Sequence, residues 1–183
     1  GSDTGGSCRI PAAYNVITGY KPSVGRVSTR GAFPLSSSFD SVGPLGASVQ
    51  CCATADSLMA GDWDGQMLPL DASALTFGVL KTLALDGLDP EVAQAFGKAI
   101  SRISKAGARL VDVSFAELGE LPELTRNGGI VAAEALATHR RRLESDGEAY
   151  DPRVRPRLAM ASALSAADYL EICRRRSELV TLF

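Results

Sequence analysis

The pattern of apolar and polar positions changes near residue 47 and divides the chain into two parts. Residues 1–47 hold eight glycines and eight serines against six charged residues, so they predict turns and short extended pieces. Within this part, the sequence NVITGYKP at residues 15–22 predicts a short strand that Pro22 ends. The remainder carries longer amphipathic runs, which predict helices and one clear strand.

Three of the predicted helices can be placed directly. Residues 47–60 form an uninterrupted helical run, and Gly61 is its expected C-terminal stop. The other two cover residues 129–143 and 165–182. The last helix opens with Ser165 and Asp168 three positions apart, which is typical of a capping box.

Residues 89–113 predict a helix followed by a strand. Asp89 and Pro90 are a typical N-cap and first helical residue, and apolar side chains then recur on one face until Gly107. That face consists of Val92, Phe96, Ala99 and Ile103. Leucine and valine at positions 110, 111 and 113 predict the strand, and a helix that leads into a strand is typical of α/β proteins.

Composition indicates one globular domain and limits its partners. The chain has 183 residues, of which 45% are hydrophobic and 22% charged, and these values exclude a disordered chain. A formal net charge of −2 gives no electrostatic reason to expect binding to nucleic acid or to a membrane surface. No run of about 18 apolar residues predicts a membrane span, and the first residues lack the pattern of a signal peptide. We therefore expect no nucleic-acid partner and no membrane.

The four cysteines are Cys8, Cys51, Cys52 and Cys173, and their spacing matches no metal-binding motif. Adjacent Cys51 and Cys52 are poorly placed for a disulfide with each other. We expect buried, reduced thiols and a cytoplasmic protein. His139 is the one histidine, so few metal sites can be built and any serine–histidine–aspartate triad would depend on it.

Candidate chemistry is concentrated in residues 1–13, GSDTGGSCRIPAA. A phosphate-binding loop needs lysine where Ser7 stands, and a hydrolase nucleophile elbow needs glycine where Arg9 stands. Residues 3–5 match the triplet of aspartic proteases, but no apolar strand precedes them. What remains is Ser7 behind a threonine and two glycines, whose backbone N–H groups can point to one spot, as in an oxyanion hole. A structural glycine–serine turn fits this short string equally well.

Three longer blocks carry more information than the short string. They are GSDTGGSCRIPAA at residues 1–13, GYKPSVGRVS at residues 19–28 and SFDSVGP at residues 38–44. In this order and with these gaps, the sequence resembles the amidase signature family. The likeness continues more weakly through LDPE at residues 88–91, AGARLVDV at 106–113, YDPR at 150–153 and SAADY at 165–169. The resemblance covers essentially the whole chain.

The resemblance implies a serine hydrolase of amide bonds that uses a serine, a cis-serine and a lysine. Ser7 would attack the amide carbonyl and form an acyl-enzyme. The backbone N–H groups of Thr4, Gly5, Gly6 and Ser7 would line the oxyanion hole.

Further residues would support this site. Ser2 stands at a position near the catalytic groups in the family. Arg9 would support the nucleophile loop or, as in some family members, meet a substrate carboxylate. A structural ion pair between Arg9 and an acid such as Asp3 is the alternative, and we favour it. Lys21 is expected to be structural, because the family has a lysine there as well as its catalytic one.

The family's catalytic lysine and cis-serine lie further upstream of the nucleophile than the six residues that precede Ser7. We therefore expect part of an α/β fold, a mixed β-sheet flanked by α-helices and incomplete at both ends. It would form one partial domain over residues 1–183. Its segments would be the nucleophile loop and core strands at 1–47, helices and a core strand at 48–115, and a helical segment at 116–183. Without its activating base, Ser7 is a poor nucleophile, so we expect the isolated chain to be inactive.

The expected function is hydrolysis of a small amide through a serine acyl-enzyme, with no metal and no organic cofactor. Two alternatives stay open. One is a glutaminase that resembles the A subunit of glutamyl-tRNA amidotransferase and passes ammonia to another active site, and the other is a non-catalytic amidase fragment. Expected partners are the small amide substrate, the remainder of the same amidase chain and, from family practice, a second copy in a homodimer.

Two arginine runs, at residues 140–142 and 174–176, lie within predicted amphipathic helices and are flanked by acids. We interpret them as solvated helix faces with pairs between neighbouring turns, not as a nucleic-acid site. His139 is expected to be exposed. The last helix also carries an apolar stripe that we expect in the core, formed by Tyr169, Ile172, Cys173, Leu179 and Phe183.

Overall fold

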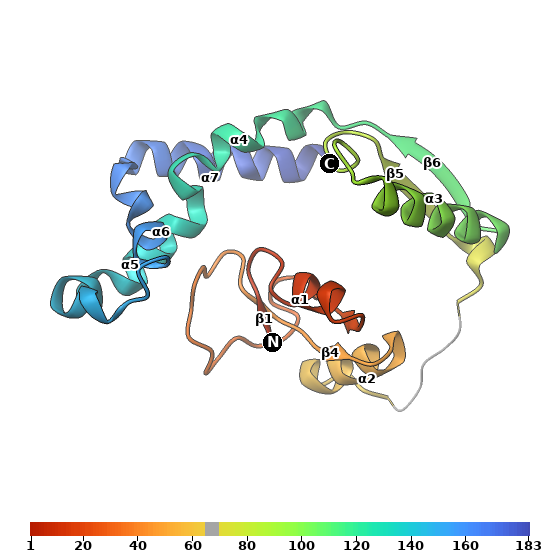
Figure 1. Ribbon diagram of the computed structural model, residues 1–183, viewed down its shortest axis with the longest axis horizontal. Helices are drawn as coiled ribbons and strands as arrows, with labels where there is room; N and C mark the ends of the chain where they lie inside the picture. Colours follow the sequence, from red (N-terminus) through yellow and green to blue (C-terminus); the bar gives the residue numbers. More distant parts are fainter. Residues whose placement is uncertain (65–69) are drawn as a thin grey trace. The chain divides into compact units, whose positions relative to one another are not determined.

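Short paired strands and the helices that connect them organise the described part of the chain (Figure 1). The computed structural model describes residues 1–64 and 70–183. They belong to two compact units. The first unit consists of Gly1–Met67 and Thr125–Arg176, and the second of Leu68–Leu124 and Ser177–Phe183. The α/β class is confirmed, and the strands in the described residues form two antiparallel pairs and one parallel pair.

The glycine-rich beginning folds into the two antiparallel pairs. These are β1 (Ser2–Asp3) with β3 (Ser41–Val42) and β2 (Thr18–Gly19) with β4 (Leu45–Gly46). Two glycines allow the backbone segments to approach each other closely. A Cβ atom on Gly19 would collide with the carbonyl oxygen of Cys8, and one on Gly43 would collide with that of Tyr20. Close packing of this part therefore depends on its glycines.

Two predictions for residues 1–47 are wrong in detail. The strand predicted at residues 15–22 is shorter, because β2 covers only Thr18–Gly19 and Val16 before it has a φ of 55°. Helix α1 (Arg9–Tyr14) was not predicted, since six residues are too few to show a helical period. Pro11 fits there because N–H groups in the first turn have no partner within the helix.

Helix α2 (Val49–Ala60) confirms the first predicted helix. Ser48 is its N-cap, and its hydroxyl accepts a hydrogen bond from the Cys51 N–H over 3.1 Å, so the helix begins after this residue and not at Ala47. Gly61 ends it with a φ of 78°, as predicted.

The second segment of the first unit is helical. Its main elements are α5 (Gly129–Asp146), α6 (Arg155–Ala159) and α7 (Ala166–Leu182), the last of which continues into the second unit. The capping box that opens α7 is confirmed. The Ser165 N–H donates to the Asp168 carboxylate over 2.9 Å, and the Asp168 N–H donates to the Ser165 hydroxyl over 3.1 Å.

The second unit contains a parallel strand–helix–strand unit. Its parts are β5 (Thr76–Leu80), α3 (Pro90–Lys105) and β6 (Arg109–Val113), followed in the chain by the short α4 (Leu121–Leu124). The predicted helix and strand are confirmed, with Gly107 between them at a φ of 100°. Strand β5 was missed. It is five residues long and interrupted by Gly78, and its partner strand lies beyond α3 in the sequence.

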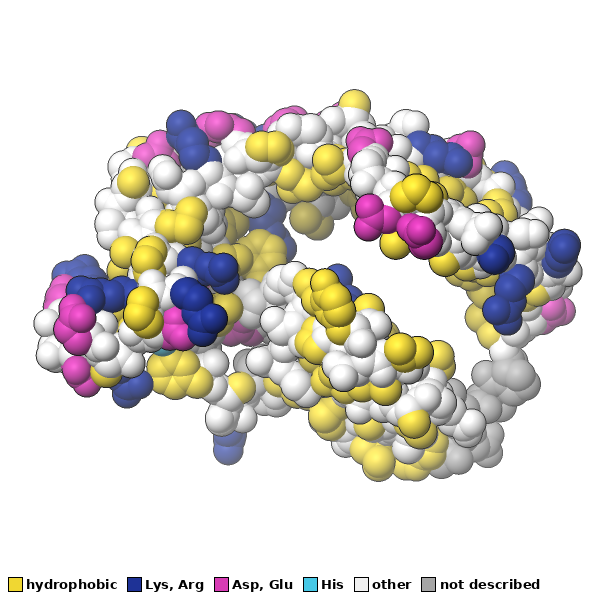
Figure 2. All heavy atoms as spheres, viewed as in Figure 1, with side chains coloured by type: hydrophobic (Ala, Val, Ile, Leu, Met, Phe, Trp, Pro, Cys, Tyr) yellow, Lys and Arg dark blue, Asp and Glu magenta, His cyan; other side chains and the backbone are white. Residues whose placement is uncertain are grey.

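Large apolar side chains remain exposed in both units. Tyr14, Val16 and Val49 are 86%, 93% and 72% exposed, and Figure 2 shows apolar side chains gathered over α1 and α2. The core stripe expected on α7 is confirmed only in part. Leu179 is buried, but Phe183 is 77% exposed, although its ring contacts another aromatic ring.

Two glycine substitutions should change stability in opposite directions. Gly61 has a φ that alanine adopts only with strain, whereas Gly97 lies inside α3 and has no heavy atom within 4 Å of an added Cβ. We expect Gly61→Ala to lower the free energy of unfolding by about 1 kcal/mol and Gly97→Ala to raise it by about 0.5–1 kcal/mol. Urea unfolding followed by circular dichroism measures both, and a shift of the same sign for the two variants would contradict this prediction.

Candidate active site

Ser7 lies in the turn between β1 and α1, where it is exposed. Within the described residues, its hydroxyl has no hydrogen-bond partner. Gly6 before it has a φ of 128°, and a Cβ atom there would lie 2.6 Å from Cδ1 of Ile10. The turn therefore needs glycine at position 6, and the residue that follows this sharp turn, Ser7, is exposed to solvent.

The turn is held from within by the buried carboxylate of Asp3. Oδ1 accepts a hydrogen bond from the Gly6 N–H over 2.6 Å, and Oδ2 accepts one from the Cys8 N–H over 3.0 Å. Arg9 adds two more, from Nε over 3.1 Å and from Nη2 over 3.2 Å. The Asp3 side chain has no exposed surface, while that of Arg9 is 52% exposed. Four donors on one buried carboxylate fix the backbone on both sides of Ser7.

The ion pair that we favoured for Arg9 is therefore present. Burial by itself raises the pKa of the Asp3 carboxyl, but the hydrogen bonds from Arg9, Cys8 and Gly6 and the Arg9 charge outweigh it. The pKa of Asp3 lies well below its ordinary value, and the same pair raises the pKa of Arg9. Asp3 is thus ionised at neutral pH and acts only as an acceptor.

Backbone N–H groups remain available around Ser7. Gly6 donates its N–H to Asp3. Among the described residues, the N–H groups of Thr4, Gly5 and Ser7 itself find no protein acceptor. Three unused donors thus lie in the turn that carries an exposed hydroxyl.

A cavity of about 200 Å³ lies beside this turn. Hydroxyl groups of Ser2, Thr4, Ser7 and Ser37 line one part of it, and Ala32, Phe33, Leu35 and Val42 supply apolar lining. The lining that the described residues form includes no lysine and no histidine. The cavity is therefore small and mostly uncharged.

Asp40 is the one charged residue of the described lining, and its oxygens are already occupied. Oδ1 accepts a hydrogen bond from the Thr4 hydroxyl over 2.5 Å, and Oδ2 accepts from the N–H groups of Leu35 and Ser36 over 2.8 Å and 3.0 Å. Asp40 thus holds the loop of residues 35–40 together and links it to the turn that carries Ser7. It lies in the SFDSVGP block, but the sequence alone indicated no role for it.

The other supporting residues can now be placed. Ser2 lies in β1 and lines the cavity with Ser7. Lys21 is not part of that lining, and its Nζ donates to the carbonyl oxygen of Pro22 over 2.6 Å, which fits the structural role expected for it. The structure thus brings Ser2, Thr4 and Ser7 to one cavity.

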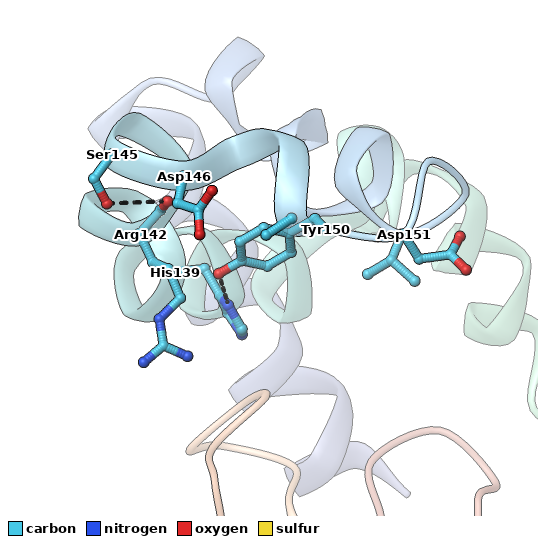
Figure 3. Close-up of a pocket in the computed structure, with 8 residues that line it drawn as sticks. His139, Arg142, Ser145, Asp146, Tyr150 and Asp151 are labelled. Atoms are coloured by element: carbon cyan, nitrogen blue, oxygen red, sulfur yellow. Dashed lines mark hydrogen bonds between the residues drawn. The ribbon is translucent and has the colours of Figure 1, made fainter.

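A second hollow, of about 710 Å³, lies at the end of α5 (Figure 3). His139, Ser145 and Asp146 line it, but they make no triad. Nδ1 of His139 lies 2.8 Å from the Tyr150 hydroxyl, and the Ser145 hydroxyl donates to the carbonyl oxygen of Arg142. His139 is half-buried, so its expected exposure is wrong, and burial and the Arg142 charge lower its pKa.

The arginine runs form the expected surface pairs. Arg140 pairs with Glu144 over 3.3 Å, and Arg174 pairs with Glu171 over 2.5 Å. Two aromatic contacts were not predicted. The Arg142 guanidinium lies 5.8 Å from the ring centre of Phe33, and that of Arg176 lies 4.7 Å from the ring centre of Phe39.

Metal-binding clusters, membrane-spanning helices and disulfides are absent from residues 1–64 and 70–183. There, no three side chains of histidine, cysteine, aspartate or glutamate are arranged to hold a metal ion. None of the helices described is both long and apolar enough to cross a lipid bilayer. All four cysteines lie in the described part, and none forms a disulfide.

The resemblance to a known family is confirmed by comparison with other proteins. Residues 1–182 match the amidase family, and the chain belongs to it. It is 35% identical, over 98% of its length, to 2-amino-5-chloromuconic acid deaminase of Comamonas testosteroni, of which it covers 38%. It is also 36% identical to the A subunit of glutamyl-tRNA(Gln) amidotransferase from Zymomonas mobilis, over 62% of this chain and 26% of that protein.

The fold agrees with this assignment. A crystal structure described as an amidase matches 99% of this chain with a TM-score of 0.85 and 35% identity. The match covers 40% of that chain. The present chain therefore spans about two fifths or less of the length of these relatives.

Replacement of Asp3 should lower stability in a pH-dependent way. The pKa of Asp3 is depressed on folding from an ordinary value of 3.8, so its contribution is present above that pH and is lost as the pH falls below about 4. We expect Asp3→Asn to lower the free energy of unfolding by about 2 kcal/mol at pH 7, a modest value because Arg9 is half exposed. The difference from wild type should shrink between pH 4 and pH 2 in urea unfolding experiments.

The matched control is Asp86→Asn, at an exposed position in the second unit. We expect it to change the free energy of unfolding by less than about 0.5 kcal/mol at any of these pH values. A difference between wild type and Asp3→Asn that stays constant from pH 7 to pH 2 would show that the Asp3 charge is not what holds the turn.

Proposed function

We propose that this chain carries the nucleophile and the oxyanion hole of an amide-bond hydrolase. The observation that supports this most directly is the turn around Ser7, where an exposed hydroxyl and three N–H groups have no hydrogen-bond partner among the described residues and lie beside a cavity. Family membership supports the same chemistry.

In the proposed reaction, Oγ of Ser7 attacks the carbonyl carbon of the amide. The carbonyl oxygen becomes an oxyanion that accepts hydrogen bonds from the N–H groups of Thr4, Gly5 and Ser7. The Gly6 N–H, which the family resemblance also assigned to this hole, is engaged by Asp3 and serves to shape the turn. The C–N bond then breaks, the nitrogen leaves with a proton, and water hydrolyses the acyl-enzyme.

Ser7 needs a base that removes its proton. The resemblance to amidases implies a lysine that acts through a cis-serine, and the described residues place neither group beside Ser7. The proposal therefore takes both groups from outside the described residues. Residues 1–183 alone should then be inactive or nearly so, because loss of the base from a catalytic triad lowers the reaction rate about 10⁴-fold.

We further propose that the substrate is a small amide without a charge near the carbonyl. The described lining of the cavity of about 200 Å³ consists of hydroxyl and apolar side chains, and the one acid among these residues, Asp40, uses both oxygens within the protein. An acyl group with a carboxylate or an ammonium would find no free partner of opposite charge in the described lining.

A second candidate is an amidotransferase component that releases ammonia for another active site. The 36% identity to the A subunit of glutamyl-tRNA(Gln) amidotransferase from Zymomonas mobilis favours it. Such a protein would purify with partner subunits, and its activity would depend on ATP and an acylated tRNA. A simple amidase would hydrolyse its substrate without them.

A cytoplasmic location is also part of the proposal. It is supported by the four cysteines, none of which forms a disulfide in the described residues. A homodimer is the oligomeric state that family practice suggests. Size-exclusion chromatography with light scattering of the protein that carries this sequence tests it directly.

Replacement of Ser7 should abolish covalent labelling and turnover. We expect a fluorophosphonate probe to add once to the protein that carries this sequence, on a peptide that contains Ser7. Ser7→Ala should prevent the adduct and lower kcat for a small amide by about 10⁴-fold. Intact mass before and after the probe, followed by peptide mapping, measures the adduct.

The matched control is Ser23→Ala, an exposed serine of the same part of the chain that does not line the cavity. It should label and turn over like wild type. An adduct that persists in Ser7→Ala, or a catalytically active protein that the probe leaves unmodified, would reject Ser7 as the nucleophile. If the wild-type protein shows neither labelling nor turnover, the non-catalytic alternative is favoured.

A further inference from the structure

The loop that forms one wall of the Ser7 cavity is clamped by a carboxylate from α5. Glu134 accepts hydrogen bonds from the Ser36 hydroxyl over 2.5 Å, from the Ser38 N–H over 3.0 Å and from the Ser38 hydroxyl over 2.5 Å. Ser36 is fully buried. Bonds to an ionised acceptor are short and strong, so three of them hold the loop firmly against α5.

Asp40 ties the same loop to the turn that carries Ser7. Ser36 donates its hydroxyl to Glu134 and its N–H to Asp40, so one buried residue connects the two carboxylates. The other oxygen of Asp40 accepts the hydrogen bond from the Thr4 hydroxyl. A continuous path of hydrogen bonds therefore joins Glu134, Ser36, Asp40 and Thr4.

The charge of Glu134 fits this arrangement. Burial by itself raises the pKa of its carboxyl, but the hydrogen bonds from Ser36 and Ser38 outweigh it, and the pKa lies below its ordinary value. An ionised carboxylate is purely an acceptor, and the Ser36 hydroxyl, the Ser38 N–H and the Ser38 hydroxyl all donate to it. Removal of the Glu134 carboxylate would leave the buried Ser36 hydroxyl without this partner.

Thr4 is the point at which this path can influence the reaction. Its N–H is one of the three that we assign to the oxyanion hole, and its hydroxyl is the group that Asp40 holds. Fixing the side chain of Thr4 also fixes the direction of the adjoining backbone N–H. A donor in an oxyanion hole is effective only when it already points to the position that the oxyanion will occupy.

We propose that Glu134 is a positioning residue of this active site, which acts through Ser36 and Asp40 to aim the Thr4 N–H at the oxyanion. The inference rests on the proposed function of Ser7. Glu134 does not line the cavity, so its effect on the reaction passes through the loop. Such an effect is strongest in the transition state, and it lowers kcat while KM stays nearly constant.

A purely structural role for Glu134 has different consequences. In that case the carboxylate would only join α5 to the loop, and its loss would reduce the fraction of folded protein. The kcat of each folded molecule, and the rate at which a probe modifies Ser7, would stay at the wild-type values.

The experiment compares wild type with Glu134→Gln in the protein that carries this sequence. Glutamine keeps the size of the side chain but removes the charge and one acceptor oxygen. The matched control is Glu144→Gln, an exposed glutamate of the same helix that pairs with Arg140. Three quantities are measured: kcat and KM for a small amide, the rate constant for fluorophosphonate modification of Ser7, and the folded fraction from urea unfolding.

We expect Glu134→Gln to lower kcat and the rate of Ser7 modification per folded molecule by about 10- to 100-fold, with KM changed by less than about twofold. Glu144→Gln should leave all three kinetic values unchanged. If Glu134→Gln does not fold, Ser38→Ala takes its place, since it removes the Ser38 hydroxyl bond and keeps Ser36 bonded to Glu134. A several-fold loss of kcat at constant KM is then expected.

A double variant tests the path itself. If Glu134 acts through Asp40, then Glu134→Gln combined with Asp40→Asn loses less activity than the product of the two single losses. Losses that simply multiply would overturn the path. Wild-type rates of Ser7 modification and turnover in folded Glu134→Gln would overturn the positioning role alone. Absence of both reactions in wild type would reject the proposed function, and this inference with it.

Discussion

The buried carboxylate of Asp3 organises the backbone of the whole candidate site. It stands in a two-residue strand, and all four of its hydrogen bonds come from residues that surround Ser7. Without this acceptor, the N–H groups of Gly6 and Cys8 would be buried and unpaired, and the turn would lose its shape. The same bonds occupy the Gly6 N–H, while those of Thr4, Gly5 and Ser7 stay without a protein acceptor among the described residues.

The pattern is repeated further from Ser7. Asp40 and Glu134 each collect donors from the loop around Ser36, as Asp3 does for the nucleophile turn. This part of the chain has strands of only two residues, so most of its N–H groups cannot be satisfied within regular secondary structure. Carboxylates are effective substitutes because one of them can accept several bonds at once. A glycine- and serine-rich segment thus becomes rigid enough to carry chemistry.

Some residues of the site could be predicted from the sequence, and others could not. Ser7 and the turn before it could be identified, because a specific motif places them in a few consecutive residues. The ion pair of Arg9 with Asp3 was also accessible, since the two residues lie six positions apart. Glu134 was not, because it lies 98 positions from Ser36 and nothing in the helical pattern of α5 distinguishes it from its neighbours. Asp40 was present in a motif, but its partner Thr4 could be known only from the fold.

The four longer helices and some of their ends could be predicted from the amino-acid sequence, because helical periodicity, caps and stop glycines are local signals. Examples are Ser165 with Asp168, and Gly61 at its positive φ. The family could be read in the same way, through motifs that need no structure. Strand Thr76–Leu80 became visible only in the folded chain, since its pairing with Arg109–Val113 joins residues on both sides of a helix. Folding likewise settles which N–H groups around Ser7 find an acceptor among the described residues, because the direction of each N–H depends on the backbone conformation of the turn around Asp3.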